Sequence, residues 1–405
     1  MTTARSDAIR QWIETNAHPL ATTAPAEPLT DLKPLAAMLA DAAIVGIGET
    51  TRAAHEVVSL GHRVLRLLVD MGFRVLAIQD DESAVETLND YLRTGDGDPD
   101  SAIAELWRPW RTSEMAEMVS WARSFNEQHP HDPFRVVGLD PPSARQANYQ
   151  AVLDHVADED SEIVDAIRRH YDAIVTAHEV PEHVQLARSS HPGRPFVDHA
   201  RDAYRLVAGL PESAARSAAL DNARLIVDFH AGSFAGGGFD YAVTRQRAVA
   251  TMTSLVGDGA KVAYWEGIAF TANAARLEPV ALLDPFQSVG NELRQQLGNR
   301  YVSLLIEFGG GDISRLHPGQ HAPAAMAGSV NADLAAAEPD RYLLDLHAPR
   351  QEPVDDWLRG THRLRVIGGI YEATADHEHY LTTGPLDEWF DAVLHVRTVG
   401  PTTLL

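Results

Sequence analysis

The chain has 405 residues, 45% of them hydrophobic, which suffices for one large globular domain or two ordinary ones. Its formal net charge of −23 argues against nucleic acids and anionic membranes as partners, because both attract basic protein surfaces. Since the chain has no cysteine, disulfides, thiolate metal ligands and a cysteine nucleophile are excluded. No apolar stretch approaches the ~20 residues that span a membrane. The first residues also lack the pattern of a signal peptide, so we expect a cytoplasmic protein.

The first half of the chain has the pattern of an α/β domain. An apolar run over 42–47 predicts a buried strand that ends at Gly48. Apolar residues at helical spacing follow over 60–71, and a second buried strand is predicted over 73–78. A strand, a helix and a strand in this order predict a parallel pair with a right-handed crossover. A third strand is predicted over 135–139.

The middle of the chain differs in pattern from both ends. From 148 to 258 strand signals disappear and helical periodicity takes over, which predicts an inserted helical subdomain. Strand signals then return over 261–265, 301–308, 365–371 and 392–396. We therefore expect an α/β fold, with a mainly parallel sheet flanked by helices, divided into 1–147, 148–258 and 259–405. Residues 309–356 are expected to form an irregular edge segment.

Charged side chains gather directly after the first predicted strand. Glu49, Arg52, His55 and Glu56 follow its end, and the last three share one face if the segment is helical. Ligands of α/β proteins lie beyond the carboxyl ends of the strands, so this cluster predicts a functional site. The alternative is a solvated first helical turn with an Arg–Glu pair.

The same stretch resembles a family signature. Gly48-Glu49-Thr50-Thr51-Arg52-Ala53-Ala54-His55-Glu56 is similar to the Gly-Glu-Ala-Thr-His-Gly-Thr-x-Glu motif of the erythromycin esterase family. Further landmarks of that family follow in the same order: Trp110-Arg111-Thr112-Ser113-Glu114, Val137-Gly138-Leu139-Asp140, and Gly290-Asn291-Glu292-Leu293 through Tyr301. The resemblance implies an α/β fold with an inserted helical region around a deep cleft. It also implies ester hydrolysis by water that a histidine and strand-end acids activate.

Three positions depart from the family pattern. Arg52 stands where the family has its catalytic histidine, and Gln79 replaces a strand-end glutamate. In Trp265-Glu266-Gly267-Ile268-Ala269-Phe270, both histidines of the family's Trp-Ala-His-Asn-x-His segment are missing. Arginine stays protonated and cannot serve as a general base at neutral pH. We therefore expect a remodelled site rather than the family's own mechanism.

Five residues are candidates for catalysis, each with a structural alternative. Glu49 is an acid/base or a substrate ligand, or else an ion-pair partner of Arg52. Arg52 stabilises an oxyanion or binds a carboxylate, or else it fills the space of the missing histidine. His55 is a substitute base or a structural residue.

The other two candidate acids follow later strands. Asp81 is the chosen acid from the run Asp80-Asp81-Glu82, where repulsion between neighbours raises a pKa; the alternative is capping of the next helix. Glu266 is a new acid/base, or else an exposed acid at a strand end.

Aromatic and polar residues near these positions are candidate substrate ligands. The set comprises Trp110, Arg111, Trp265 and Gln79, although tryptophans at such spacing also serve as core residues. His377 and His379 could bind a metal if they lie on one strand, but a polar hairpin is the expected alternative. We expect neither a metal nor a cofactor. The chain has no Gly-x-Ser-x-Gly or His-Glu-x-x-His motif, which disfavours a serine hydrolase or a zincin.

These observations predict a diverged erythromycin-esterase-like enzyme. It would perform acid/base chemistry (dehydration, cyclisation, isomerisation or modified hydrolysis) on a bulky apolar small molecule, a polyketide-type secondary metabolite. One alternative is a non-catalytic binder that confers self-resistance by sequestration. Another is an esterase that uses His55 as its base. The oligomeric state stays open.

Overall fold

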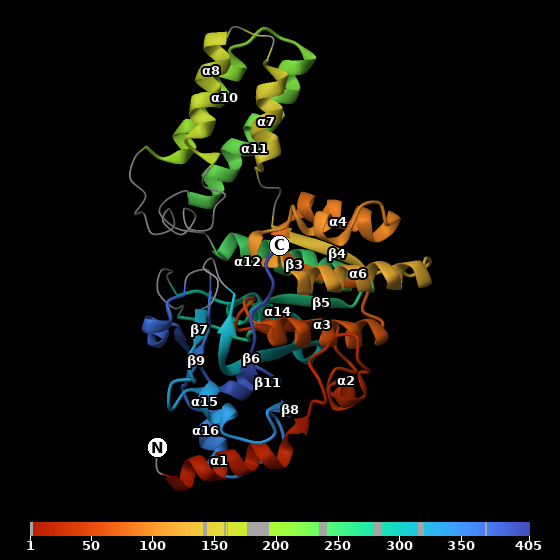
Figure 1. Cartoon of the computed structure of the whole chain (residues 1–405), viewed down its shortest axis with the longest axis vertical. Helices are drawn as coiled ribbons and strands as arrows, with labels where there is room; N and C mark the ends of the chain where they lie inside the picture. Colours follow the sequence, from red (N-terminus) through yellow and green to blue (C-terminus); the bar gives the residue numbers. More distant parts are fainter. Residues whose placement is uncertain are drawn as a thin grey trace. The chain divides into compact units, whose positions relative to one another are not determined.

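The computed structural model describes residues 3–140, 144–157, 159, 161–175, 194–234, 241–278, 285–314, 320–368 and 371–405. These residues form two compact units (Figure 1). One unit joins Met1–Leu139 to Ala242–Leu405, and the other comprises Asp140–Tyr241. Each unit is considered by itself below.

The first unit is built on one large sheet. Its strands run in the order β1-β8-β11-β6-β2-β5-β3-β4, and β7 pairs with β6. Their bounds are β1 His18–Pro19, β2 Ile44–Glu49, β3 Val75–Asp81, β4 Arg135–Asp140, β5 Val262–Gly267, β6 Tyr301–Ile313, β7 Gln320–Ala322, β8 Arg341–Asp345 and β11 Ala392–Val399. The pairs β2–β5, β2–β6, β3–β5 and β11–β6 are parallel. The predicted α/β fold with a mainly parallel sheet is therefore confirmed.

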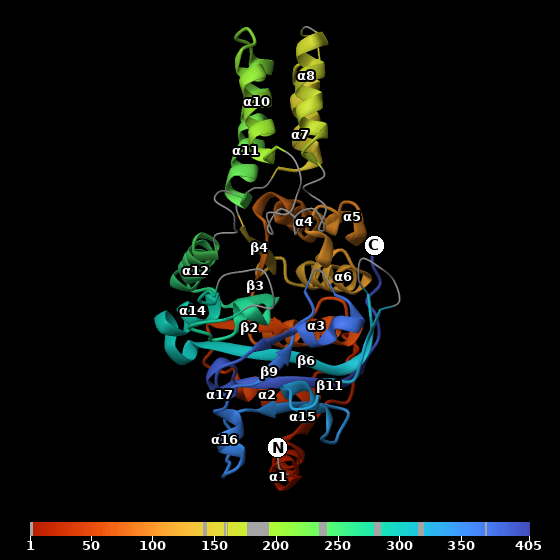
Figure 2. The same cartoon turned by 90° about the vertical axis from the view of Figure 1, so that its left-hand side faces the viewer.

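Alternating side chains of the central strands supply both faces of the sheet. In β5, Ala263 and Trp265 belong to one hydrophobic cluster, whereas Val262 and Tyr264 belong to another. This alternation follows from the two-residue period of a strand, and apolar residues at both phases require helices on both faces. Figure 2 shows β2, β6 and β11 of this sheet with α3 alongside.

Helices cover the sheet through these clusters. Leu60, Leu65 and Leu68 of α3 pack with β2, β5 and β6 residues on one face, whereas Val249 and Met252 of α12 join Tyr264 on the other. The helices of this unit are α1 Thr3–Asn16, α2 Lys33–Met38, α3 His55–Asp70, α4 Glu82–Thr94, α5 Pro99–Ile103, α6 Ser113–Gln128, α12 Tyr241–Gly257, α13 Ile268–Thr271, α14 Val289–Leu297, α15 Val330–Ala335, α16 Val354–Leu358 and α17 Leu386–Trp389.

Two sequence-based expectations differ from the structure. Within 309–356, expected to be irregular, the chain forms β7, α15 and β8, and β8 pairs antiparallel with β11 inside the large sheet. The strand predicted over 365–371 is much shorter. It ends at Arg365 as β9 (Arg363–Arg365) and pairs with β10 (Tyr380–Thr382) in a separate two-stranded ribbon. The physical reason is that the backbone leaves the ribbon after Arg365, and the Ile367 N–H donates to the Thr50 carbonyl oxygen at 2.9 Å instead of to a strand of the ribbon.

Apart from Asp140, which ends β4, the regular secondary structure described in the second unit is helical. These helices are α7 Gln146–His155, α8 Ser161–Asp172, α10 Phe196–Ala208 and α11 Ala214–Phe234. They share a core that includes Val152, Ile167, Ala203 and Ile226. Within the described parts of the whole chain, none of the helices has the length and apolar character needed to cross a membrane.

Candidate active site

The carboxyl ends of β2, β5 and β3 lie at one edge of the sheet. These strands are neighbours in the order β2-β5-β3, and both pairs are parallel. The register places Gly48 opposite Glu266 and Glu49 opposite Gly267. The predicted strand-end acids Glu49 and Glu266 therefore come from adjacent strands at the same level.

Arg52 bridges these two acids. Its Nε donates to Glu49 Oε1, and its Nη2 donates to Glu266 Oε1 at 2.5 Å. Trp265 Nε1 donates to the other Glu49 oxygen at 2.9 Å. The Arg52 guanidinium carbon also lies 3.8 Å from the centroid of the Trp110 ring. One cation thus contacts two carboxylates and an aromatic face, which holds it in a fixed position.

Burial and neighbouring charges shift the protonation of this cluster. Glu49 is 2% exposed, and burial raises the pKa of its carboxyl, with the Glu266 charge adding to the increase and Arg52 opposing it. Burial acts to lower the pKa of the Arg52 guanidinium, but the charges of Glu266 and Glu49 outweigh it, so the net pKa is raised. Arg52 therefore keeps its positive charge.

Three distant segments fix the link that carries Arg52. This link, 50–54, joins β2 to α3. Ile367 N–H donates to the Thr50 carbonyl oxygen at 2.9 Å. The Ala53 carbonyl accepts from Ser314 N–H at 2.8 Å and from Thr402 N–H at 3.2 Å. Because these bonds involve the backbone, they set the place of Arg52 independently of its side-chain contacts.

The acid run after β3 divides into three environments. Asp80 is 5% exposed and accepts backbone N–H groups of Trp107 at 2.8 Å and of Asp81 at 2.7 Å. Burial raises the pKa of Asp80 to about 6. The two backbone hydrogen bonds and the Arg52 charge act in the opposite direction but do not outweigh burial. Asp81 caps α4 by accepting from the backbone of Ser83 and Ala84.

Glu82 makes an exposed ion pair with Arg247 at 2.9 Å. Asp81, the acid chosen from the sequence, thus has the contacts of a helix cap. The Arg52 charge acts on Asp80, and Asp81 is buried as well, at 7% exposed.

His55 forms a second polar group at this edge. His55 Nδ1 lies 2.8 Å from Glu114 Oε1, and His55 Nε2 lies 3.4 Å from the Ser59 hydroxyl. Glu114 is on the first turn of α6, which Thr112 caps by accepting from Met115 N–H. Sequence reasoning did not select Glu114, although it closes the Trp-Arg-x-x-Glu segment that carried part of the family resemblance.

The candidate substrate ligands have different exposures. Trp110 is 2% exposed and Trp265 is fully buried, so both rings pack inside this unit and contact Arg52 and Glu49 respectively. Arg111 Nε donates to the Leu106 carbonyl oxygen at 2.6 Å. Gln79 is half-buried. The exposed tryptophan of this region is Trp107, at 46%.

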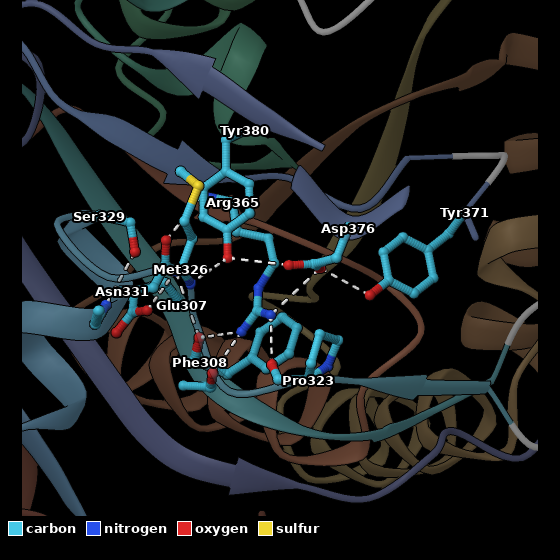
Figure 3. Close-up of polar contacts among 12 residues, drawn as sticks. Glu307, Phe308, Pro323, Met326, Ser329, Asn331, Arg365, Tyr371, Asp376 and Tyr380 are labelled. Carbon is cyan, nitrogen blue, oxygen red and sulfur yellow. Dashed lines mark hydrogen bonds and ion pairs between the residues drawn. The ribbon is translucent and has the colours of Figure 1, made fainter. Parts of the chain in front are cut away.

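A buried polar network supports the segment that reaches Thr50. Figure 3 shows Arg365 directed at Asp376 and at carbonyl oxygens, including that of Pro323 at 2.7 Å. Tyr371 and Tyr380 donate to the two oxygens of Asp376 at 2.7 and 3.2 Å. Since Ile367 lies between Arg365 and Tyr371, this network anchors the chain on both sides of its bond to Thr50.

His377 and His379 do not lie together on one strand, which a shared metal site would require. Residues Ala373–Glu378 form a 3-10 helix rather than a strand, and the His377 side chain is 70% exposed. Across the residues that the structure describes, no group of three or more His, Cys, Asp or Glu side chains is arranged to hold a metal ion.

Comparison with known proteins decides the family. The sequence pattern of the erythromycin esterase family matches residues 68–399. The chain belongs to the erythromycin esterase family. The resemblance inferred from its motifs is thereby confirmed, although the matched region begins after the Gly48–Glu56 motif. A curated relative, erythromycin esterase type II of Escherichia coli, is 24% identical over 133 residues. That match spans 33% of this chain and 31% of the relative.

Solved structures share the fold of this family member. A succinoglycan biosynthesis protein matches with a TM-score of 0.69 at 22% identity, covering 100% of both chains. A Bacillus cereus protein matches with a TM-score of 0.68 at 21% identity, covering 99% of both chains. A mutant of the erythromycin esterase EreC, in its open conformation, matches with a TM-score of 0.55 at 15% identity, covering 93% of this chain and 96% of that one.

Proposed function

We propose that this erythromycin esterase family member is an enzyme that performs acid/base chemistry on a bulky, largely apolar small molecule of the polyketide type. The observation that carries the proposal is the bridge that Arg52 forms between Glu49 and Glu266 at the ends of adjacent strands. Arginine cannot accept a proton at neutral pH, so the family position that it occupies serves charge stabilisation here.

The environments of the acids separate their roles. Burial raises the pKa values of the Glu49 and Asp80 carboxyls, so we assign these two groups as the candidate proton donors. Glu266 Oε2 is buried and has no hydrogen-bond partner among the described residues, so Glu266 is a candidate proton acceptor, together with His55. Arg52 then stabilises negative charge that develops on a substrate oxygen. This division supports dehydration, cyclisation, isomerisation or a modified hydrolysis.

A mass-spectrometric assay tests the proposal. The wild-type protein is incubated with erythromycin and other macrolide lactones, and products are separated by liquid chromatography. A gain of one water indicates hydrolysis, a loss indicates dehydration, and a new product of unchanged mass indicates cyclisation or isomerisation. Glu49→Gln and Glu266→Gln are expected to lower turnover at least about 100-fold, the usual scale of general acid–base catalysis.

The matched control is Glu82→Gln, which removes an exposed acid that pairs with Arg247. Its turnover is expected to equal that of the wild type. Unchanged turnover in both Glu49→Gln and Glu266→Gln would overturn the proposal. Circular dichroism of each variant establishes that the fold is retained.

A second candidate function is non-catalytic sequestration of such a molecule. The observation that favours it is that Arg52 already contacts two carboxylates and the Trp110 ring, so its charge is compensated within the protein. This alternative predicts tight binding of the macrolide by calorimetry, with the recovered ligand chemically unchanged.

A further inference from the structure

His55 has an accessible ring and a buried partner. Its side chain is 44% exposed, whereas that of Glu114 is 6% exposed. A carboxylate only accepts hydrogen bonds, so the tautomer that fits the 2.8 Å contact carries its proton on Nδ1. The lone pair is then on Nε2, where Ser59 approaches to no closer than 3.4 Å. Ser59 itself is 1% exposed, which leaves the imidazole as the reactive group of this cluster.

The segment Gly400–Leu405 holds His55 from one side. The His55 backbone N–H donates to the Gly400 carbonyl oxygen at 2.8 Å. Thr402 N–H donates to the Ala53 carbonyl oxygen at 3.2 Å, and Ala54 forms an antiparallel bridge with Pro401. These bonds fix the start of α3, where His55 is the first residue.

The same segment holds Glu114 from the other side. Thr403 N–H lies 3.3 and 3.2 Å from the two carboxylate oxygens of Glu114. The Thr403 carbonyl oxygen accepts from Ser113 N–H at 2.8 Å, and Leu405 N–H donates to the Arg111 carbonyl oxygen at 3.0 Å. One short stretch of backbone therefore connects the beginnings of α3 and α6.

We propose that His55 is the general base of this site, that Glu114 orients it, and that the Thr403 N–H fixes the Glu114 carboxylate. The proposal rests on the proposed function and deepens it, because it separates the base from the donors Glu49 and Asp80. Glu114 and Thr403 act through His55 and are positioning residues. A base held by a carboxylate on one nitrogen and open on the other is the arrangement that activates water in many hydrolases.

The proton transfers of this mechanism balance without any further reactant. His55 Nε2 takes a proton from water or from a substrate hydroxyl, and the Glu114 carboxylate stabilises the resulting imidazolium. In a hydrolysis, the water oxygen forms a bond to the carbonyl carbon while the ester C–O bond breaks. A donor carboxyl, Glu49 or Asp80, gives its proton to the departing oxygen. The proton on Nε2 then returns to that carboxylate through solvent, which restores neutral His55 and the protonated donor.

Chemical labelling tests the positioning without a substrate. Diethyl pyrocarbonate acylates exposed imidazole nitrogens, and peptide mass spectrometry gives the rate for each histidine. His377, 70% exposed, serves as the internal reference, and the buried His62 as the unreactive one. The rate for His55 relative to His377 is expected to fall at least threefold in Glu114→Gln and in Thr403→Pro. Thr403→Val keeps the N–H and is expected to label like the wild type.

Turnover tests the catalytic part. His55→Ala is expected to lower the turnover of the macrolide lactones about 100-fold or more. Added imidazole is expected to restore at least a tenth of it, which a merely structural role of His55 would not allow. If His55→Ala keeps wild-type turnover while Glu49→Gln loses it, this inference is overturned and the proposed function stands. Labelling of His55 that is unaffected in both Glu114→Gln and Thr403→Pro overturns the positioning roles.

Discussion

The Arg52 guanidinium carbon lies 3.8 Å from the centroid of the Trp110 ring, so this cation stacks on an aromatic face while it pairs with two carboxylates. The contact joins the link before α3 to the segment before α6. Four residues further along the chain, Glu114 on the first turn of α6 contacts His55, the first residue of α3. The two candidate groups of this edge are therefore held by one interface between the beginnings of α3 and α6.

Removing the cation should destabilise the fold. In Arg52→Ala, Glu49 and Glu266 stay buried without their partner, and we expect the free energy of unfolding at pH 7 to fall by about 3–5 kcal/mol. The loss should shrink at lower pH, because burial raises the pKa of the Glu49 carboxyl and a protonated Glu49 no longer needs the cation. Urea denaturation at pH 7 and pH 5 measures both values. The control Arg93→Ala breaks an exposed pair with Asp90 and should cost less than about 1 kcal/mol. Equal losses in the two variants would contradict this account.

Asp80 should make both stability and turnover depend on pH. Its pKa is raised to about 6, so the folded state binds more protons than the unfolded state between its ordinary value and pH 6. Stability from this group is complete at low pH and is lost as the pH rises through 6. We expect Asp80→Asn to be about 1–3 kcal/mol more stable than the wild type at pH 7. Thermal unfolding at several pH values measures this difference.

The donor role of Asp80 gives a second measurement. Turnover should fall as the pH rises through about 6, where Asp80 loses its proton, and Asp80→Asn should lack this limb of the profile. The same limb in Glu82→Gln is expected to persist, because Glu82 is an exposed acid at the start of α4. A limb that survives in Asp80→Asn would assign the proton to another group.

The sequence predicted the central strands because each contains a short run of mainly apolar residues. It did not predict β8, since Arg341–Asp345 has only three apolar residues between two charged ones and is stabilised by pairing with the distant strand β11. The strand-end acids Glu49 and Glu266 followed from the strand positions alone. The different environments of Asp80 and Asp81 did not, because they depend on the backbone angles where β3 turns into α4.

Sequence patterns also could not predict contacts between residues that are far apart in the chain. The contact between His55 and Glu114 joins residues that are 59 apart, and Thr403 reaches Glu114 from 289 residues away. No periodicity encodes such a contact. The tryptophans illustrate the same limit, because Trp110 and Trp265 are buried while Trp107 in the same stretch is 46% exposed.

His62 should destabilise the protein in acid. It is 2% exposed on α3, neither ring nitrogen has a hydrogen-bond partner in the described structure, and burial lowers its pKa to about 3, with Arg66 adding to the decrease. The unfolded state therefore binds the additional proton between about pH 6.5 and 3, so stability falls with falling pH by up to about 1.4 kcal/mol per unit.

We expect His62→Leu to lack this acid-dependent loss of stability. Its free energy of unfolding also changes by an amount that does not depend on pH, because the ring contact with Trp121 is lost. Urea denaturation between pH 4 and pH 7 gives the slope for each protein. The control is the exposed His131→Gln, whose pH dependence should match the wild type. A His62→Leu slope equal to that of the wild type would refute the assignment.

Gly61 controls the position of Trp265 and, through it, of Glu49. A Cβ atom at position 61 would lie 2.3 Å from the Trp265 ring, which is rigid and fully buried and donates its Nε1–H to Glu49. Gly61→Ala therefore has to displace the ring, at a cost of about 1–3 kcal/mol of unfolding free energy. Displacing the ring also removes the hydrogen bond to Glu49, so turnover should fall with the stability.

The matched control is Gly257→Ala, where nothing lies within 4 Å of the added atom. This variant should leave both the unfolding free energy and the turnover unchanged. Calorimetry and the macrolide assay measure the pair, and a fully active, fully stable Gly61→Ala variant would show that this packing does not position Glu49.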